Sequence, residues 1–222
     1  MANGVTIRYT GTELAVQNAW NQSTPKPLFI KEDPKNTGTP EWFAVVFFTT
    51  ANPKILEYAK SAGSAVSTFF TPPGETEPVP FNNIVTSLVD NMSALFNNAI
   101  TFNKSVRSWD TSKVYTMDYM FAGANAFNQD VSSFDTSNVQ NMEGMFSMGG
   151  LDPQFNNAGL PGIGSWNTSK VATMKVMFQN ARNFNQNLRG WDVSKVTEKT
   201  NMFSSAQRML PYNYPQNFPT PF

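Results

Sequence analysis

A motif of about 25 residues recurs along the second half of this 222-residue chain and constrains its fold more than any other feature. The phenylalanine that ends each Leu-Phe or Met-Phe pair recurs at spacings of 25, 25, 32 and 25 residues, at Phe96, Phe121, Phe146, Phe178 and Phe203. A unit this short cannot bury its apolar side alone, so it must stack on its neighbours. The sequence therefore predicts an array of stacked repeats, one of which carries an insertion of seven residues.

Apolar residues at fixed positions of the repeat form columns. The first column is valine, at Val89, Val114, Val139, Val171 and Val196, and the next is methionine, at Met92, Met117, Met142 and Met174. Their spacing is that of one apolar helix face, which predicts a short helix in each repeat, from Val114 to Phe121 in the second. The last repeat has Lys199 in the methionine column, and a charge there predicts the exposed end of the array.

The other half of each repeat reads aliphatic-x-x-aromatic-x-Thr or Val, as in Val106, Trp109 and Thr111. This pattern predicts a short strand whose aromatic and Thr side chains point inward, with the Asp or Asn between them pointing outward. Stacked repeats would place these strands in parallel, about 4.8 Å apart. Strand, helix and return is the plan of a leucine-rich repeat.

The segment FNQDVSSFDTSNVQNMEGMF, from Phe127 to Phe146, resembles the repeat of BspA-like leucine-rich-repeat surface proteins, which are also known from mycoplasma lipoproteins. The resemblance extends from about Leu88 to Ala206. It implies an α/β repeat solenoid and a surface-displayed, non-enzymatic role in binding or adhesion.

The first 70 residues predict a small α+β region with a possible anchoring role. Residues 5–9 alternate between apolar and polar side chains, which predicts a strand. Residues 21–40 are rich in turn formers and predict a loop. Residues 41–50 are rich in aromatic and β-branched residues and predict a buried strand. Asn52-Pro53 predicts the start of a helix. Residues 71–80 are dense in proline and predict a linker. Residues 81–206 predict the solenoid, with a helical opening cap up to Phe96. Residues 207–222 predict an extended arm.

Composition excludes several kinds of chemistry. The chain has no cysteine and no histidine, which excludes disulfides, thiolate nucleophiles, zinc sites built on these residues and imidazole acid-base catalysis. Sixteen basic and sixteen acidic residues balance, which argues against a nucleic-acid partner. The start of the sequence shows no secretory signal, and the longest apolar run, Phe43 to Phe48, is too short to span a bilayer. We expect no cofactor, no metal and no membrane insertion.

One polar column is a candidate binding face. It consists of the outward residues Asp110, Asp135, Asn167 and Asp192. Neighbouring carboxylates about 5 Å apart could serve as a glycosidase pair, with Asp110 and Asp135 as the candidates. The interpretation we favour is that each residue hydrogen-bonds the backbone two residues further on, as in an Asx turn, because the residue recurs in every repeat whereas catalysis needs one pair.

Two further features could contact a ligand. An asparagine follows a phenylalanine in each repeat, at Asn103, Asn128, Asn156 and Asn185, and we expect an internal ladder that satisfies backbone groups rather than a row facing a ligand. The insertion, residues 147–165, brings the candidate contact residues Leu151 and Leu160, because insertions in solenoids form surface loops. The methionine columns are expected to fill the core rather than to bind a soft metal.

The arm interleaves proline with aromatic residues and needs a surface on which to lie. Its candidate docking residues are Tyr212, Tyr214, Phe218 and Phe222. Together with the absent signal, this predicts a subunit made in the cytoplasm and assembled with protein partners, best a minor capsid or surface component of a virion. The alternatives are an adhesin or receptor-binding module for a glycan or host protein, and a carbohydrate-active enzyme.

Overall fold

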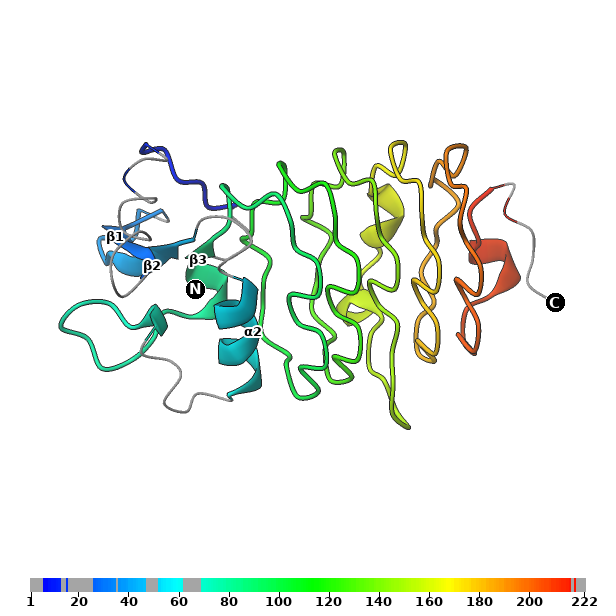
Figure 1. Ribbon diagram of the computed structural model, residues 1–222, viewed down its shortest axis with the longest axis horizontal. Coiled ribbons are helices and arrows are strands. Elements are labelled where there is room, and N and C mark those ends of the chain that lie inside the picture. Colours follow the sequence, from blue (N-terminus) through cyan, green and yellow to red (C-terminus); the bar gives the residue numbers. More distant parts are fainter. Residues whose placement is uncertain are drawn as a thin grey trace.

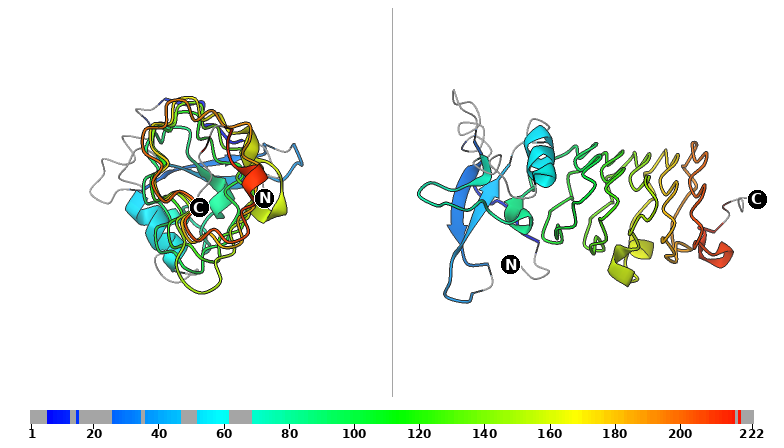
Figure 2. Two further views of the ribbon diagram at one scale, coloured as in Figure 1. Left: turned by 90° about the vertical axis from the view of Figure 1, so that its right-hand side faces the viewer. Right: turned by 90° about the horizontal axis from the view of Figure 1, so that it is seen from below.

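The computed structural model describes residues 6–12, 15, 26–34, 36–46, 52–61, 69–216 and 218. Its regular elements in chain order are β1 (Leu28–Glu32), β2 (Glu41–Val45), α2 (Asn52–Lys60), η3 (Phe81–Asn83), β3 (Ile84–Val85), η4 (Asn157–Gly159), η5 (Ile163–Ser165) and η6 (Pro211–Asn213). Figure 1 shows an elongated molecule in which successive coils of chain stack along the long axis, with the sheet and α2 at one end and η6 at the other. Viewed along that axis in Figure 2, the coils superimpose.

The N-terminal region contains a three-stranded sheet in the order β1-β2-β3. β1 pairs antiparallel with β2, and β2 pairs parallel with β3, which leads directly into the first coil. The helix expected at Asn52 is confirmed, and so is the start of the strand expected at Glu41, although its expected end lies outside the described residues. The loop expected over residues 21–40 is wrong where β1 forms, because Leu28 to Glu32 pair with β2.

The strand expected over residues 5–9 is also wrong in its described part, residues 6–9. This segment lies along the coils instead, where the Ile7 N–H donates to the Ser108 carbonyl at 2.9 Å and the Tyr9 N–H to the Ser87 hydroxyl at 3.0 Å. Because the Tyr9 N–H donates to a side-chain hydroxyl and not to a backbone carbonyl, the regular backbone pairing of a strand does not form here.

Each coil is joined to the next by a parallel ladder in the segment where a helix was expected. Isolated parallel bridges link one residue of each coil, in the order Asn91, Thr116, Asn141, Thr173 and Glu198. At each of the four junctions, four N–H groups on alternate residues donate to carbonyls of the next coil; in the first junction the donors are Met92, Ala94, Phe96 and Asn98. These N–H groups point along the stack, so they cannot make the bonds of an α-helix.

The helix prediction is wrong because the apolar spacing on which it relied also fits a chain of tight turns. Inward residues are joined by three-residue turns, such as those from Met117 to Met120 and from Phe121 to Ala124, whose N–H groups donate to the carbonyl three residues earlier. A chain that turns inward every third residue gives an apolar spacing close to that of a helix. Several of these turns place a non-glycine residue at positive φ, including Tyr119 and Val176.

The short strand expected at residues 106–111 is wrong for the same reason. Trp109 turns back on Val106 through a bond from its N–H to the Val106 carbonyl, at 3.1 Å. Trp109 and Thr111 point inward as expected and are buried. The threonine hydroxyls donate to the carbonyl of the Asp or Asn in the next coil, in the pairs Thr86 to Asp110, Thr111 to Asp135, Thr136 to Asn167 and Thr168 to Asp192. The leucine-rich-repeat-like class itself stays a prediction.

Two columns of stacked rings form the core. The first contains Phe96, Phe121, Phe146, Phe178 and Phe203, with successive ring centroids 5.1, 5.5, 5.7 and 5.6 Å apart. The second contains Phe102, Phe127, Phe155 and Phe184, at 5.8, 6.0 and 5.9 Å. Such offset ring stacks add to the free energy gained by burying apolar area. The methionine columns are buried beside the rings.

The chain covers both ends of this core itself. At the N-terminal end, Tyr58 of α2 stacks on Phe81 at 4.3 Å, and Phe81 contacts Phe96 of the first coil. At the other end, Tyr214 and Phe218 pack on the ring of Phe203. The expected extended arm is therefore wrong for residues 211–213, which form η6 and lead Tyr214 back onto the last coil.

Residues 71–80 do not separate two cores. One cluster of buried residues runs from Ala44 to Met209 and so includes residues on both sides of this segment, while Phe43, Val45 and Val85 form a small second cluster. The Val79 carbonyl accepts a hydrogen bond from the Tyr58 hydroxyl at 3.0 Å. The division of the chain into an N-terminal region and a solenoid, with residues 71–80 as the linker, stays a prediction. In the described part of the chain, no helix has both the length and the apolar character needed to cross a membrane.

Candidate functional site

The predicted Asp and Asn column forms turns. At Asp110, Asp135, Asn167 and Asp192, the side-chain Oδ1 accepts the N–H of the residue two further on, at 2.9 to 3.1 Å. The favoured Asx-turn interpretation is confirmed in this respect, although no helix follows. Hydrogen bonds from Ser194 lower the pKa of Asp192, as expected for a carboxylate that accepts from a turn.

Asp110 does not share the exposure of the other three residues. Its side chain is only 4% exposed, and its Oδ2 lies 2.7 Å from Nε of Arg8. The expectation that it points outward is wrong, because the N-terminal segment covers it. Asp135, Asn167 and Asp192 are exposed. Across the described residues, no three acidic side chains gather in a group that could hold a metal ion.

The asparagine column forms the internal ladder expected from the sequence. Each Oδ1 accepts the N–H of the residue at the same position of the next coil, from Asn103 to Asn128, Asn128 to Asn156 and Asn156 to Asn185, at 2.9 to 3.0 Å. Asn185 accepts from Leu210 and from the Asn213 side chain, so the C-terminal segment takes the place of a further coil. These amides are therefore occupied within the stack.

The insertion is held firmly and presents its two candidate residues to solvent. Leu151 is 90% exposed, yet its carbonyl accepts a bond from Arg182 at 3.0 Å. Leu160 is 46% exposed, and its carbonyl accepts from Nδ2 of the fully buried Asn157 at 2.7 Å. Asn157 also accepts the Val131 N–H at 2.9 Å and so anchors the insertion to the neighbouring coil.

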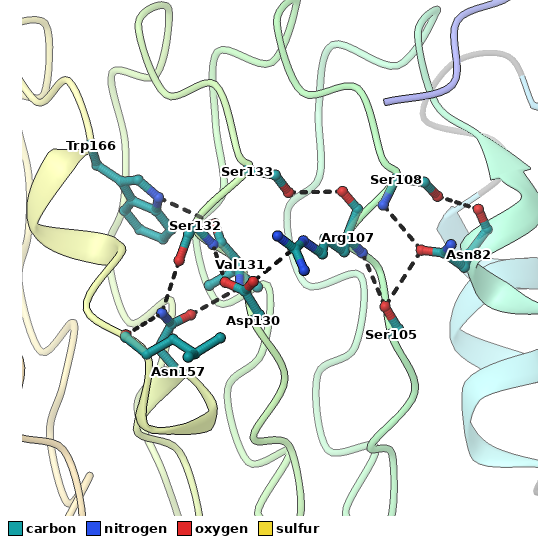
Figure 3. A network of polar contacts seen from close by, with 11 residues as sticks. Asn82, Ser105, Arg107, Ser108, Asp130, Val131, Ser132, Ser133, Asn157 and Trp166 are labelled. Atoms are coloured by element: carbon teal, nitrogen blue, oxygen red, sulfur yellow. Dashed lines mark hydrogen bonds and ion pairs between the residues drawn. The ribbon is translucent and has the colours of Figure 1, made fainter. Parts of the chain in front are cut away.

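Figure 3 shows that polar groups of neighbouring coils beside the insertion form hydrogen bonds and ion pairs with one another. Nε of Arg107 lies 3.4 Å from Oδ2 of Asp130, and the Arg107 carbonyl accepts the Ser133 hydroxyl at 2.8 Å. The Trp166 indole N–H donates to the Val131 carbonyl in the same network. Such an internally bonded surface offers few unpaired groups to a ligand.

A cluster that was not predicted lies on the ladder side of the coils, and we call it the tyrosine patch. It consists of Tyr115, Asp118, Tyr119, Glu143 and Lys175, from three successive coils. The Tyr119 hydroxyl donates to Oε1 of Glu143 at 2.7 Å, and Nζ of Lys175 lies 4.0 Å from the same oxygen. Tyr115 is 45% exposed.

Small and polar neighbours shape this patch. The Tyr119 ring lies against Gly144, where a Cβ would approach a ring carbon to 2.4 Å, so glycine is needed beneath the ring. The Asp118 carboxylate accepts the hydroxyls of Ser93 and Thr116, and its orientation is thereby fixed. The hydrogen bond to Glu143 raises the pKa of Tyr119 to about 12. The residues of the patch occupy the variable positions between the apolar columns, so only their tyrosine content could have distinguished them in the sequence.

A pocket of about 590 Å³ lies where α2 meets the first coil. Its lining includes the rings of Tyr58, Phe81 and Phe102, with Glu77 and Lys104 among its charged residues. Tyr58 stacks on Phe81, Phe81 meets Phe102 edge to face, and burial raises the pKa of Tyr58. The pocket thus belongs to the packing between the N-terminal region and the coils.

Three of the four candidate docking residues can be placed. Tyr214 and Phe218 lie on Phe203 of the same chain, whereas Tyr212 is 64% exposed. Phe222 lies outside the described residues. Nζ of Lys199 sits 5.2 Å from the Phe218 ring centroid, so the charge expected at the end of the array meets an aromatic face.

Comparison with known proteins bears on the repeats. No curated protein and no solved structure matches the chain. A protein family matches residues 66–159 and 152–215, which include every coil and the segment that closes the last one. Because these ranges cover more than half of the sequence, the chain belongs to the family described as Mycoplasma protein of unknown function, DUF285.

Proposed function

We propose that this chain is a non-enzymatic interaction protein that recognises a glycan through the tyrosine patch. We further propose that it is a BspA-like surface protein with a role in adhesion. The observation that carries the proposal is the patch itself, in which partly exposed aromatic rings and oriented carboxylates lie on coils whose backbones are joined at every junction.

The chemistry of the patch suits a sugar. An aromatic ring offers an apolar face to the C–H groups of a sugar ring, while the hydroxyls of Tyr115 and Tyr119 are held by bonds to Asn91 and Glu143. Carboxylates accept hydrogen bonds from sugar hydroxyls, and charged acceptors make stronger bonds than neutral ones. Asp118 and Glu143 supply such acceptors, and Lys175 beside them supplies a donor.

The enzyme alternative has less support. It required Asp110 and Asp135 as a carboxylate pair on an open face. Both oxygens of Asp110 are engaged, one by the Ser112 N–H and one by Arg8, and the side chain is buried. A residue held in this way is poorly placed to reach a substrate.

The alternative that the chain is a virion component stays a prediction. One of the observations that favoured it was a C-terminal arm free to dock on another subunit. Tyr214 and Phe218 instead pack on the chain's own last coil, and among the placed candidates only Tyr212 is well exposed.

A glycan array with the purified full chain tests the proposal. We expect selective binding that falls about tenfold or more for Tyr115→Ala and for Glu143→Gln, because stacking and charge-assisted hydrogen bonds are each lost. Tyr212→Ala is the matched control, since it removes an exposed tyrosine far from the patch and should leave binding unchanged. A blank array, or equal loss with all three variants, would contradict the proposal; a pull-down of a protein partner that depends on Tyr115 would replace the glycan by a protein.

A further inference from the structure

Most backbone hydrogen bonds of the ladder that joins the coils run in one direction. At each junction four N–H groups on alternate residues of one coil donate to carbonyls of the next, while fewer N–H groups donate backward, as Thr197 does to the Ala172 carbonyl. In the last junction the forward donors are Met174, Val176, Phe178 and Asn180. The stack therefore ends in donors at its C-terminal side.

Among the described residues, the corresponding N–H groups of the last coil do not donate to any backbone carbonyl. They belong to Lys199, Asn201, Phe203 and Ser205, each 25 residues after a donor of the preceding coil. The Lys199 N–H lies toward the carboxylate of its neighbour Glu198 and helps to lower the pKa of that group. We call this row, residues 199–205, the donor edge.

The described part of the C-terminal segment covers the apolar core of the last coil and makes no backbone hydrogen bond to the donor edge. Its backbone bonds go elsewhere: the Asn213 carbonyl accepts the Leu188 N–H at 2.8 Å, and the Tyr214 N–H donates within η6. Tyr214 and Phe218 contact the Phe203 ring. The side chains of the core are thus closed while the backbone edge remains open, and an open edge is a template for another chain.

The identity of the missing partner follows from hydrogen-bond polarity. Two copies related by a two-fold axis would bring the donor edges face to face, where neither can accept. A head-to-tail contact is opposed because the N-terminal region packs over the other end of the stack, through Phe81 on Phe96. The partner must supply acceptors along the row, as carbonyl or carboxylate oxygens do.

Charge points to the same kind of partner. Residues 189–208 of the last coil contain four basic and two acidic side chains, in a protein of zero net charge. The acidic residue nearest the row, Glu198, is used by the coil itself, since its Oε1 accepts the Thr200 N–H at 2.9 Å. Aligned N–H groups add further positive potential, as they do at anion-binding backbone sites.

We propose that the donor edge binds an acidic peptide segment of a partner protein by edge pairing, with the segment's oxygens completing the ladder beyond Lys199, Asn201, Phe203 and Ser205. Backbone bonds provide affinity in this mode of recognition, and complementary charge provides preference and speed of association. The segment must order on binding, so the complex is transient.

The probe is a short end-blocked peptide of alternating glutamate and threonine, added to the full-length protein at low salt. We expect saturable binding by fluorescence anisotropy and slower hydrogen exchange of the amides at 199, 201, 203 and 205 by NMR. A charge-reversed peptide of alternating lysine and threonine should not bind. Wild-type exchange is read without any mutation, so the proposal can be tested even if a variant fails to fold.

A pair of substitutions separates the backbone donor from the side-chain charge. Lys199→Ala removes the charge and keeps the N–H, whereas Lys199→Pro removes both. We expect Lys199→Pro to bind the acidic peptide about fivefold more weakly than Lys199→Ala, the loss of one hydrogen bond. Equal binding by the two variants, unchanged exchange at the four amides with saturating peptide, or equal binding of the charge-reversed peptide would each overturn the proposal.

Discussion

Asn157 shows how a single side chain can fix an insertion in a regular stack. It is fully buried and adopts a positive φ of 53°, which asparagine tolerates better than most residues. Its amide bonds the Val131 N–H, the Ser132 hydroxyl and the Leu160 carbonyl. The extra residues between Phe155 and Trp166 therefore do not leave the Val131 N–H of the neighbouring coil unpaired.

Asn157→Ala should lower the free energy of unfolding by about 2–3 kcal/mol, because the buried Val131 N–H and Leu160 carbonyl lose their partner. Chemical denaturation measures this. Asn138→Ala is the matched control: Asn138 also bonds a carbonyl, that of Ser112, but it is exposed and water can replace it, so the change should stay within about 0.5 kcal/mol. Similar losses in both variants would mean that burial at Asn157 is not what matters.

The Tyr119 hydroxyl donates to the Glu143 carboxylate at the surface of the coils. The bond to Glu143 raises the pKa of Tyr119 to about 12, so in the folded state the hydroxyl keeps its proton above its usual pKa of 10.0. Between these values the folded state binds more protons than the unfolded state, and stability falls as the pH rises. The contribution is present below pH 10 and is lost as the pH passes 12.

Carbon-13 NMR of ring-labelled tyrosine should find one residue that titrates near pH 12, assigned to Tyr119. Glu143→Gln should return the pKa of Tyr119 toward its usual range, because the charged acceptor is removed. Glu57→Gln, at an exposed carboxylate paired with Lys54 on α2, is the control and should leave the Tyr119 titration unchanged. An unshifted Tyr119 in the wild type would show that the bond to Glu143 does not persist in solution.

At the scale of the element, the unit of this structure is the junction between two coils rather than a helix or a strand. Each of the first three junctions combines a backbone ladder, a threonine hydroxyl, an asparagine amide and a contact in each of the two ring columns. The last junction lacks the second ring contact because that column ends at Phe184. The last described coil has Val193 in the threonine column, and the segment with η6 packs on this coil where the earlier coils meet another coil. The threonine column thus reports where coils meet.

Thr136→Val tests the buried hydroxyl of one junction. The Thr136 Oγ1 donates to the Asn167 carbonyl at 3.0 Å in a buried setting, so valine of similar shape leaves that acceptor unpaired. We expect a loss of about 1–2 kcal/mol in unfolding free energy. Thr197→Val removes a hydroxyl-to-carbonyl bond across a junction at an exposed position and should cost much less. Equal costs would assign the effect to the intrinsic preference of valine rather than to burial.

At the scale of the whole molecule, stability should follow the order of the coils. Each coil contacts only its neighbours, as in other repeat proteins, so the ends of the stack open most easily unless they are covered. The N-terminal sheet and α2 cover one end, and the segment with η6 covers the other (Figure 2). The two covers differ in size, which predicts that the C-terminal end opens first.

Removing residues 210–222 should expose the Phe203 ring and free the Leu188 N–H. We expect faster hydrogen exchange at Met174 and Val176, in the last junction, and unchanged exchange at Met92, in the first. Tyr212→Ala, in the same segment but exposed, should leave exchange as in the wild type. A uniform change along the chain would instead indicate that the stack unfolds as a single cooperative unit.

The sequence by itself determined the period, the inward columns and the internal bonding of the polar ones. Burial of Phe121, Met117 and Trp109 follows from apolar side chains at fixed spacing, and the turns at Asp135 and the ladder at Asn128 follow from amides and carboxylates that bond locally. These are consequences of side-chain chemistry and neighbouring positions along the chain.

Tertiary structure alone decided how the backbone connects these columns. A three-residue apolar spacing fits a helix and a coil of tight turns equally well, and only the next coil, by accepting the N–H groups of Met117 and Tyr119, selects the turns. Likewise, Asp110 is covered and Tyr214 folds back because of segments distant in sequence. The tyrosine patch and the donor edge arise in the same way, because a surface shared by several coils exists only once the coils have stacked.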